Sequence, residues 1–178
     1  MESEQTDYFL LGDVNLKPSD AVVGLIVCDD GKYLMQLRSQ KAGIFYPGHW
    51  GLFGGAVDPG ETADAALSRE LREELGIEIA HARYFTEFNF DFGFCGLGRV
   101  WRRYYKIEIA SSSVDRMVLG EGSELRPFHA GEILTGQRVV PYDAFAIWLH
   151  ANQEKSAATA ATNQSSPSPC SANLLTRA

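Results

Sequence analysis

GGAVDPGETADAALSRELREELGI is the sequence of residues 54–77, and it carries a group of closely spaced acidic side chains. Glu70, Glu73 and Glu74 fall within about 100° of one another if the stretch is helical. Carboxylates this close repel one another, and their pKa values would rise unless a cation neutralised them. Their hard oxygen atoms suit Mg²⁺ or Mn²⁺. The alternative is an ordinary solvated helix face, on which Arg69 and Glu73 form an i,i+4 ion pair.

The same stretch carries the signals of a helix over residues 62–75. Thr62 is a suitable N-cap, and Gly76 stands where a helix commonly stops. Leucines at every fourth position form one narrow apolar stripe: Leu67, Leu71 and Leu75. The helix can therefore bury its leucines on a sheet while its carboxylates face a neighbouring cleft.

Strand patterns on both sides of this helix predict an α/β (α+β) fold. AVVGLIVC is an apolar run typical of a buried strand, DDG is a hairpin turn, and KYLMQLRS alternates as a return strand. Proline in the first turn favours a terminal helix in PYDAFAIWLHA. The expected strands cover residues 21–28, 32–39, 77–92, 99–110 and 124–128, and the expected short and terminal helices cover residues 130–134 and 141–151.

The composition suits one globular domain with poorly ordered ends. The chain has 178 residues, of which 45% are hydrophobic, so a domain over residues 18–150 can bury a core. Residues 1–17 are expected to be a lead-in, in which Tyr8–Leu11 could form an edge strand. Residues 151–178 are rich in small and polar residues and are expected to be a disordered tail.

Charge and cysteine usage limit the possible binding partners and the cellular compartment. A net charge of −7 makes a nucleic-acid polymer an unsuitable partner, although small phosphorylated ligands can be held through metal ions. Cys28, Cys95 and Cys170 are odd in number and widely spaced, which favours a reducing, cytoplasmic setting. The acidic N-terminus lacks the basic region of a signal peptide, and no apolar run is long enough to span a bilayer.

The fixed residues within 54–77 follow a known spacing. Five residues separate Gly55 from Glu61, and seven separate Glu61 from Arg69-Glu70-Leu71; then Glu73-Glu74 and Gly76-Ile77 each follow after one further residue. This is the full Nudix box, G-x5-E-x7-R-E-U-x-E-E-x-G-U, in which U is aliphatic. The chain resembles the Nudix hydrolases over about residues 18–150. The resemblance implies an α/β/α sandwich around a mixed β-sheet.

The resemblance also implies an activity and a metal. Nudix hydrolases typically use a divalent cation to cleave a phosphoanhydride bond in a nucleoside diphosphate linked to another moiety, X. In this chain Glu70 and Glu74 would be the principal ligands of Mg²⁺ or Mn²⁺. Glu73 would be a further ligand, and the backbone carbonyl of Gly54 would also contact the metal.

Other residues are expected to support this chemistry. Either Glu70 or a loop glutamate would take the proton of the attacking water, and Glu121 is favoured over Glu124 as that loop residue. Glu61 is expected to support the site or help to hold the metal. Arg69 is expected to orient the glutamates through ion pairs.

Substrate choice has weaker signals in the sequence. Arg38 could bind a phosphate, Trp50 could stack on a base or sugar, and Arg102 lies on the strand face that could see the cleft. WGLFGG (residues 50–55) is similar to a segment of nucleotide-sugar hydrolases and favours such a substrate. The chain is also compatible with dimerisation.

Three other functions remain as alternatives. A nucleoside triphosphate pyrophosphohydrolase would use the same box. A non-catalytic nucleotide sensor usually carries a degraded box or an added DNA-binding domain, and the intact box here argues against it. Isopentenyl diphosphate isomerase shares the fold but relies on a cysteine motif that this sequence lacks.

Overall fold

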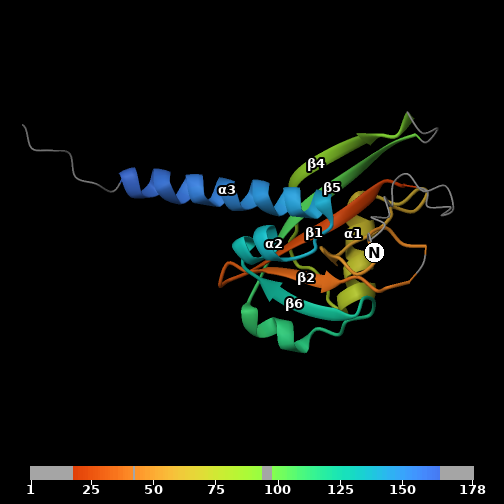
Figure 1. Cartoon of the computed structure of the whole chain (residues 1–178), viewed down its shortest axis with the longest axis horizontal. Helices are drawn as coiled ribbons and strands as arrows, with labels where there is room; N and C mark the ends of the chain where they lie inside the picture. Colours follow the sequence, from red (N-terminus) through yellow and green to blue (C-terminus); the bar gives the residue numbers. More distant parts are fainter. Residues whose placement is uncertain (1–17, 42, 94–97, 165–178) are drawn as a thin grey trace, which may run out of the picture.

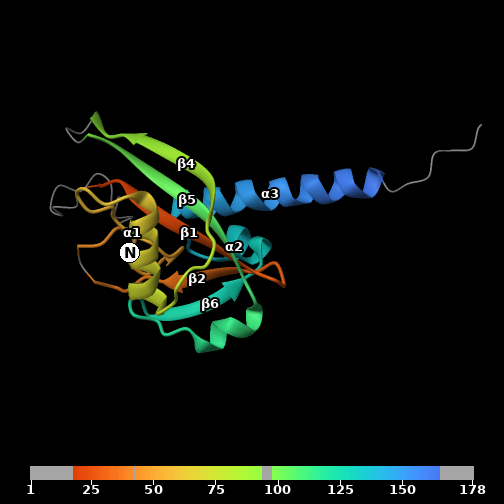
Figure 2. The ribbon, with the colours of Figure 1, turned by 180° about the vertical axis from the view of Figure 1, so that it is seen from behind.

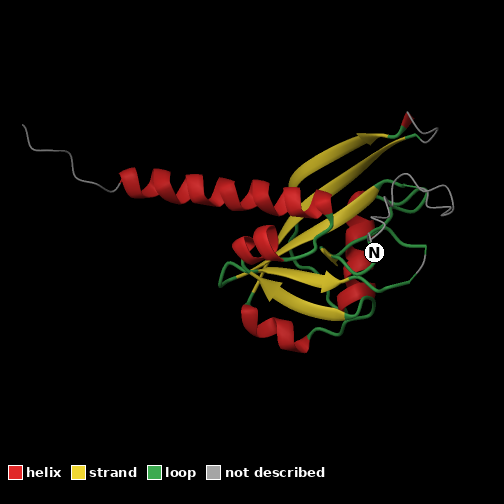
Figure 3. Ribbon diagram, in the orientation of Figure 1, coloured by secondary structure: helices red, strands yellow, loops and turns green. Residues whose placement is uncertain are grey.

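The computed structural model describes residues 18–164 of the chain, apart from residue 42 and residues 94–97. This part forms a six-stranded mixed sheet with helices on both faces (Figure 1 and Figure 3), so the expected α/β/α arrangement is confirmed. The expected edge strand at Tyr8–Leu11 and the last residues of the chain lie outside the described residues.

The sheet has strand order β3-β2-β1-β5-β4, and a further strand, β6, pairs with β2 outside this order. β1 and β5 run parallel, and the remaining pairs are antiparallel. β1 and β2 form the expected hairpin, in which Gly31 takes a φ of +79° that favours glycine. The strands are β1 (Ala21–Cys28), β2 (Tyr33–Leu37), β3 (Trp50–Gly51), β4 (Arg83–Asp91), β5 (Arg99–Ile109) and β6 (Glu124–Phe128).

The sheet divides between β1 and β2. These strands pair at one register position, Val27 with Tyr33. Beyond it, the backbone N–H groups of Val22 and Gly24 donate to the carbonyls of Gly55 and Phe53, at 3.0 and 2.8 Å, while β2 continues alongside β3 and β6. The first residues of the 54–77 stretch therefore run through the centre of the sheet.

Helices cover the two faces of this sheet. α1 (Ala63–Leu75) packs on one face, and α2 (Ala130–Gly136) and α3 (Pro141–Gln164) lie on the other, as the opposite views of Figures 1 and 2 show. The expected leucine stripe of α1 is fully buried in the hydrophobic core between α1 and the sheet. Thr62 caps α1 by accepting a hydrogen bond from the Ala65 N–H at 3.2 Å, and Gly76 ends it with a φ of +65°. The helix signals in the sequence are thus confirmed.

α3 is longer than the sequence analysis predicts. The helix was expected to end at Ala151, with a disordered tail beyond residue 150, but it continues to Gln164. The polar composition of this segment leaves little to bury, yet the Ala-rich run at residues 157–161 has high intrinsic helix propensity. Figure 1 shows that this part of α3 extends away from the sheet. Within the described residues, no helix is long and apolar enough to cross a membrane.

His150 attaches α3 to the sheet. Its side chain is buried, and Nδ1 lies 2.8 Å from the hydroxyl oxygen of Tyr33 on β2. The other ring nitrogen, Nε2, has no hydrogen-bond partner among the described residues and lies 3.5 Å from a carboxylate oxygen of Glu154. Burial lowers the pKa of His150, and the charge of Lys106 lowers it further. Folding therefore favours the neutral imidazole.

Replacing His150 with Gln is expected to make folding less sensitive to acid. A histidine whose pKa is lowered in the folded chain contributes stability above its ordinary pKa of 6.5, and that contribution is lost as the pH falls below this value. Between about pH 7.5 and about pH 5.5, the wild-type Tm should fall more than that of His150→Gln. His81→Gln makes the same change at an exposed position and should behave as the wild type. An equal fall in Tm in all three proteins would contradict the conclusion that folding favours the neutral form of His150.

Candidate active site

Glu74 provides a buried carboxylate where the sheet divides. It lies in the last turn of α1, and 6% of the residue is exposed. One carboxylate oxygen accepts a hydrogen bond from Nε2 of Gln36 at 2.8 Å, and the other accepts from the backbone N–H of Gly54 at 2.7 Å. Burial raises the pKa of Glu74 to about 7, although both hydrogen bonds oppose the shift. The charges of Glu70 and Glu121 raise this pKa further.

Glu70 lies one helical turn before Glu74 and is half-buried. Burial is the largest cause that raises its pKa, hydrogen bonding from Arg69 opposes the shift, and the charges of Glu73 and Glu121 add to it. The backbone of Gly55 passes close to this carboxylate, because a Cβ atom at Gly55 would lie 2.5 Å from the Glu70 carboxylate atoms. Glu70, Glu74 and Glu121 thus influence one another across a small space beside the glycine turn.

Arg69 ties the glycine turn to the helix. Its guanidinium lies 2.9 Å from a carboxylate oxygen of Glu61, 2.7 Å from one of Glu70 and 3.4 Å from one of Glu73. It also donates to the backbone carbonyl of Ala56 at 3.0 Å. The hydrogen bond from Arg69 lowers the pKa of Glu61, so Glu61 stays ionised and holds Arg69 in place. This geometry agrees with the expected orienting role of Arg69.

The structure separates the remaining acidic candidates. The Glu73 side chain is 59% exposed and lies 3.4 Å from the Arg69 guanidinium, which also contacts Glu70. The expectation that Glu73 is a further metal ligand stays a prediction. Glu121 lies near enough to raise the pKa values of Glu70 and Glu74. Glu124 begins β6, where it is exposed opposite Leu37.

The donor set suits a divalent cation that is only partly coordinated by protein. Within the described residues, no group of three or more His, Cys, Asp or Glu side chains forms a ready-made metal cage. Mg²⁺ commonly binds through one or two carboxylates and completes its shell with water and substrate phosphates. Glu70 and Glu74 offer such carboxylates, and their raised pKa values show the cost of holding both charges there without a cation. The residues present therefore fit Mg²⁺ or Mn²⁺.

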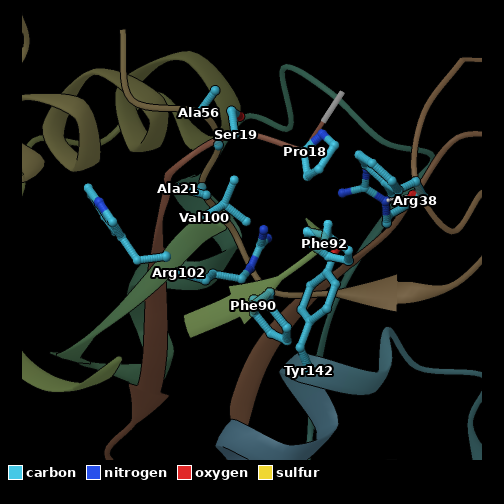
Figure 4. Close-up of a pocket in the computed structure, with 14 residues that line it drawn as sticks. Pro18, Ser19, Ala21, Arg38, Ala56, Phe90, Phe92, Val100, Arg102 and Tyr142 are labelled. Carbon is cyan, nitrogen blue, oxygen red and sulfur yellow. Dashed lines mark hydrogen bonds between the residues drawn. The ribbon is translucent and has the colours of Figure 1, made fainter. Parts of the chain in front are cut away.

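A cavity of about 220 Å³ opens beside the glycine turn, on the side of the sheet that carries α3. Figure 4 shows Arg38 and Arg102 directed into it from two walls, with the rings of Phe90 and Tyr142 between them. Gly54 and Gly55 also line it, so the glycine turn lies between the cavity and the Glu70 and Glu74 carboxylates, which do not line it. The cavity thus combines positive charge and flat apolar surfaces beside the glycine turn.

Arg102 is held in the cavity wall by Tyr142 and Asp143 at the start of α3. Its guanidinium carbon lies 4.3 Å from the centre of the Tyr142 ring, and its Nε lies 3.9 Å from a carboxylate oxygen of Asp143. Asp143 is buried and accepts hydrogen bonds from the Tyr104 hydroxyl and the Leu52 N–H, both at 3.0 Å. The Nε of Arg102 has no hydrogen-bond partner among the described residues. This nitrogen is itself buried.

Trp50 does not occupy the position expected of a substrate-stacking residue. It is 7% exposed, and its ring packs edge-on against Phe128 with 4.7 Å between centroids. Its backbone pairs with Leu37 at the start of β3, which directs the ring into the core beneath α2 and α3. We therefore correct the expected substrate-binding role of Trp50 to core packing.

Three residues of the site were missed from the sequence. Gln36 is a polar residue inside the short strand YLMQL, where every neighbour is hydrophobic, and that contrast was a usable signal. Tyr142 and Asp143 stand in the first turn of α3, where an acidic residue is common. Their position opposite Arg102 depends on how α3 packs across β5, and the local sequence carries no sign of that.

Alanine substitutions at the two adjacent glycines should have different effects. Gly54 has a φ of +130°, and an added Cβ would collide with the backbone carbonyl of Val22, so Gly54→Ala should destabilise the fold by about 1–3 kcal/mol. Gly55→Ala should instead displace the flexible end of Glu70 and weaken Mn²⁺ binding with little change in stability. Chemical denaturation and Mn²⁺ titration would measure these effects. The reverse pattern would contradict this description of the turn.

Comparisons with known proteins agree with this arrangement. A family model described as the NUDIX domain matches residues 18–158. Over 58 residues the chain is 45% identical to the nucleoside triphosphatase NudI of Escherichia coli O1:K1 / APEC; the match covers 33% of this chain, and the chain spans 40% of the length of that relative. The fold is similar to the MutT protein of Methanosarcina mazei Go1, with a TM-score of 0.64 and 23% identity over 78% of this chain and 97% of that one.

A second solved structure supports the same assignment. The E. coli ORF135 protein has a TM-score of 0.62 and 26% identity over 82% of this chain and 96% of its own. The family model matches most of the chain, and the box it contains forms the turn and helix that build the carboxylate site. The chain belongs to the Nudix family.

Proposed function

We propose that this chain is a divalent-metal-dependent hydrolase that cleaves a phosphoanhydride bond of a small nucleotide. The observation that supports it most directly is the placement of the glycine turn: Gly54 and Gly55 line the arginine-lined cavity and also lie against the Glu74 and Glu70 carboxylates. One side of this site suits a hard cation, and the other suits a nucleotide. A phosphoanhydride would lie between them.

Each group has a distinct task in this proposal. A bound divalent cation would offset the charge of the phosphates and acidify water at the site. Glu70 and Glu74 would hold that cation, and Arg69 would keep Glu70 oriented. Glu121 would accept the proton of the attacking water, with Glu70 as the alternative, because the charge of Glu121 acts on both carboxylates and the loop that carries it is hydrogen-bonded to the backbone of Glu74 through Gly120.

Nucleoside triphosphates are the first substrates to test. The segment that is 45% identical to a relative named as a nucleoside triphosphatase supports this choice. The nucleotide-sugar preference still rests on the likeness of WGLFGG to nucleotide-sugar hydrolases, while Trp50 lies in the core and adds no stacking surface for a base or sugar. A nucleoside diphosphate linked to a sugar remains the second candidate, since the cavity is open beside its aromatic rings.

Incubation with nucleoside triphosphates, nucleotide sugars, ADP-ribose and dinucleotides, each with Mg²⁺ or Mn²⁺, would test the proposal. Metal-dependent release of phosphate, pyrophosphate or a nucleoside monophosphate is expected for at least one class. No turnover with any of them, in a folded protein that binds metal, would instead favour a nucleotide sensor.

Replacing Glu74 with Gln should lower kcat by a factor on the order of 100 or more without unfolding the protein. The substitution removes a proposed metal ligand, while the neutral side chain suits a buried position in which the carboxylate pKa is already raised to about 7. Steady-state kinetics and Tm would be measured together. Glu78→Gln changes an exposed glutamate just beyond α1 and should leave kcat unchanged. Near-normal activity of Glu74→Gln would refute the metal-ligand assignment.

Arg102→Lys is expected to raise KM for the nucleotide about tenfold or more, with a smaller effect on kcat. Lysine keeps a positive charge beside Asp143 but loses the planar set of donors. Arg103→Lys is a matched control, because Arg103 points to the opposite face of β5, where it stacks on Trp101 and pairs with Glu87. Equal KM values in the two variants would show that Arg102 does not contact the substrate.

A further inference from the structure

We propose that Gln36 is a positioning residue for this site. Its amide holds the Glu74 carboxylate in a single orientation. The same side chain packs against the loop that carries Glu121 and so fixes the position of that loop. Gln36 belongs to β2, outside the 54–77 stretch. The inference rests on the proposed function, because it assigns Glu74 and Glu121 to metal binding and proton transfer.

Gln36 is a polar side chain in a position that otherwise suits an apolar one. It is 3% exposed, and its backbone lies between β3 and β6, opposite Gly51 and Leu125. A buried amide lowers stability unless it is hydrogen-bonded. The hydrogen bond that compensates here runs from Nε2 to a carboxylate oxygen of Glu74, at 2.8 Å. The buried amide of Gln36 is therefore satisfied by its hydrogen bond to Glu74.

The two hydrogen bonds to Glu74 come from separate parts of the fold. Gln36 donates to one carboxylate oxygen from β2, and the Gly54 N–H donates to the other from the glycine turn at 2.7 Å. Because each oxygen has its own donor, rotation of the carboxylate would break at least one bond. Each oxygen still keeps a lone pair that can face a cation. Gln36 thus fixes the direction in which those lone pairs point.

The oxygen side of the Gln36 amide faces the loop that follows residue 117. A Cβ atom at Gly122 would lie 2.7 Å from the amide oxygen of Gln36 and 3.0 Å from the carbonyl oxygen of Leu37. Gly122 also has a φ of +84°, which favours glycine. The loop therefore packs directly on the Gln36 side chain, with no room for a larger residue.

The same loop is attached on both sides of Glu121. The N–H of Gly120 donates to the backbone carbonyl of Glu74, and the N–H of Ser123 donates to the carbonyl of Leu37, both at 2.8 Å. Gln36 lies between these two attachments and contacts Glu74 and Gly122 at once. A change at Gln36 would therefore move the metal carboxylate and the proposed base relative to each other.

Gln36→Met tests the proposal, because it keeps the length of the side chain and removes the amide. Mn²⁺ affinity would be measured by calorimetry without nucleotide, and kcat, KM and Tm would be measured separately. We expect Mn²⁺ to bind about 10–100-fold more weakly and kcat to fall by a similar factor. KM should change by less than about threefold, since Gln36 does not line the cavity proposed to bind the substrate.

Two comparisons separate positioning from core packing. Met35→Leu alters the adjacent buried residue on the opposite face of β2 and should leave Mn²⁺ affinity unchanged. In a double-mutant cycle, Gln36→Met should have little further effect on Mn²⁺ binding once Glu74 is Gln, because the contact that it removes is already altered. If Gln36→Met does not fold, Gln36→Asn, which keeps the amide but is one methylene shorter, should give a smaller loss in the same direction.

The outcomes distinguish this inference from the proposed function. Mn²⁺ affinity within about threefold of the wild type in Gln36→Met or in a folded Gln36→Asn, or an equal loss in Met35→Leu, would overturn the positioning role. A wild-type chain that binds Mn²⁺ but hydrolyses no nucleotide would contradict the proposed function alone, and the Mn²⁺ comparison would still decide the role of Gln36. A wild-type chain that binds no Mn²⁺ would overturn both.

Discussion

A carboxylate buried at the end of α1 joins three distant parts of the chain. Glu74 accepts hydrogen bonds from Gln36 on β2 and from the backbone of Gly54, and its own backbone carbonyl accepts one from Gly120. An ionised group is costly in such a place unless donors or a cation surround it. The buried position is maintained because the leucine stripe of α1 holds the helix on the sheet. Packing on one side of the helix thus sustains an electrostatically unfavourable arrangement beside it.

The division of the sheet makes room for this arrangement. If β1 and β2 paired along their full length, no backbone segment could enter between them. Instead β1 bonds to residues 53–55, which brings Gly54 and Gly55 against Val22 and the Glu70 carboxylate. Only a residue without a Cβ fits at Gly54, where φ is positive and the Val22 carbonyl is close. The glycines are therefore steric requirements of the site as well as parts of a turn.

The substrate side of the site is built on a second buried carboxylate. Asp143 accepts hydrogen bonds from Tyr104 and Leu52 and lies beside Arg102, whose guanidinium also stacks on Tyr142. The carboxylate balances the arginine charge without using all of its donors. The glycine turn lies between this cavity and the Glu70 and Glu74 carboxylates.

Much of this molecule was predictable from periodicity and spacing. Thr62, the leucine stripe and Gly76 define α1 through local rules of helix capping and burial, and the spacing of Glu61, Arg69, Glu70 and Glu74 identified the family. Strand alternation placed Arg102 and Arg103 on opposite faces of β5, but it did not say which face lines the cavity. The length of α3 was underestimated, because a polar Ala-rich segment has high helix propensity without anything to bury.

The sequence by itself determined the helix that carries the box and the chemical type of its side chains, because those depend on residues close together along the chain. Tertiary structure alone decided the surroundings of each candidate: Glu74 is buried, the Glu73 side chain is 59% exposed, and Trp50 fills the core. Gln36 acquires its role through a contact 38 residues away, and Asp143 through contacts 39 and 91 residues away. The physical reason is that burial and hydrogen-bond partners belong to the packed arrangement, and a local pattern does not contain them.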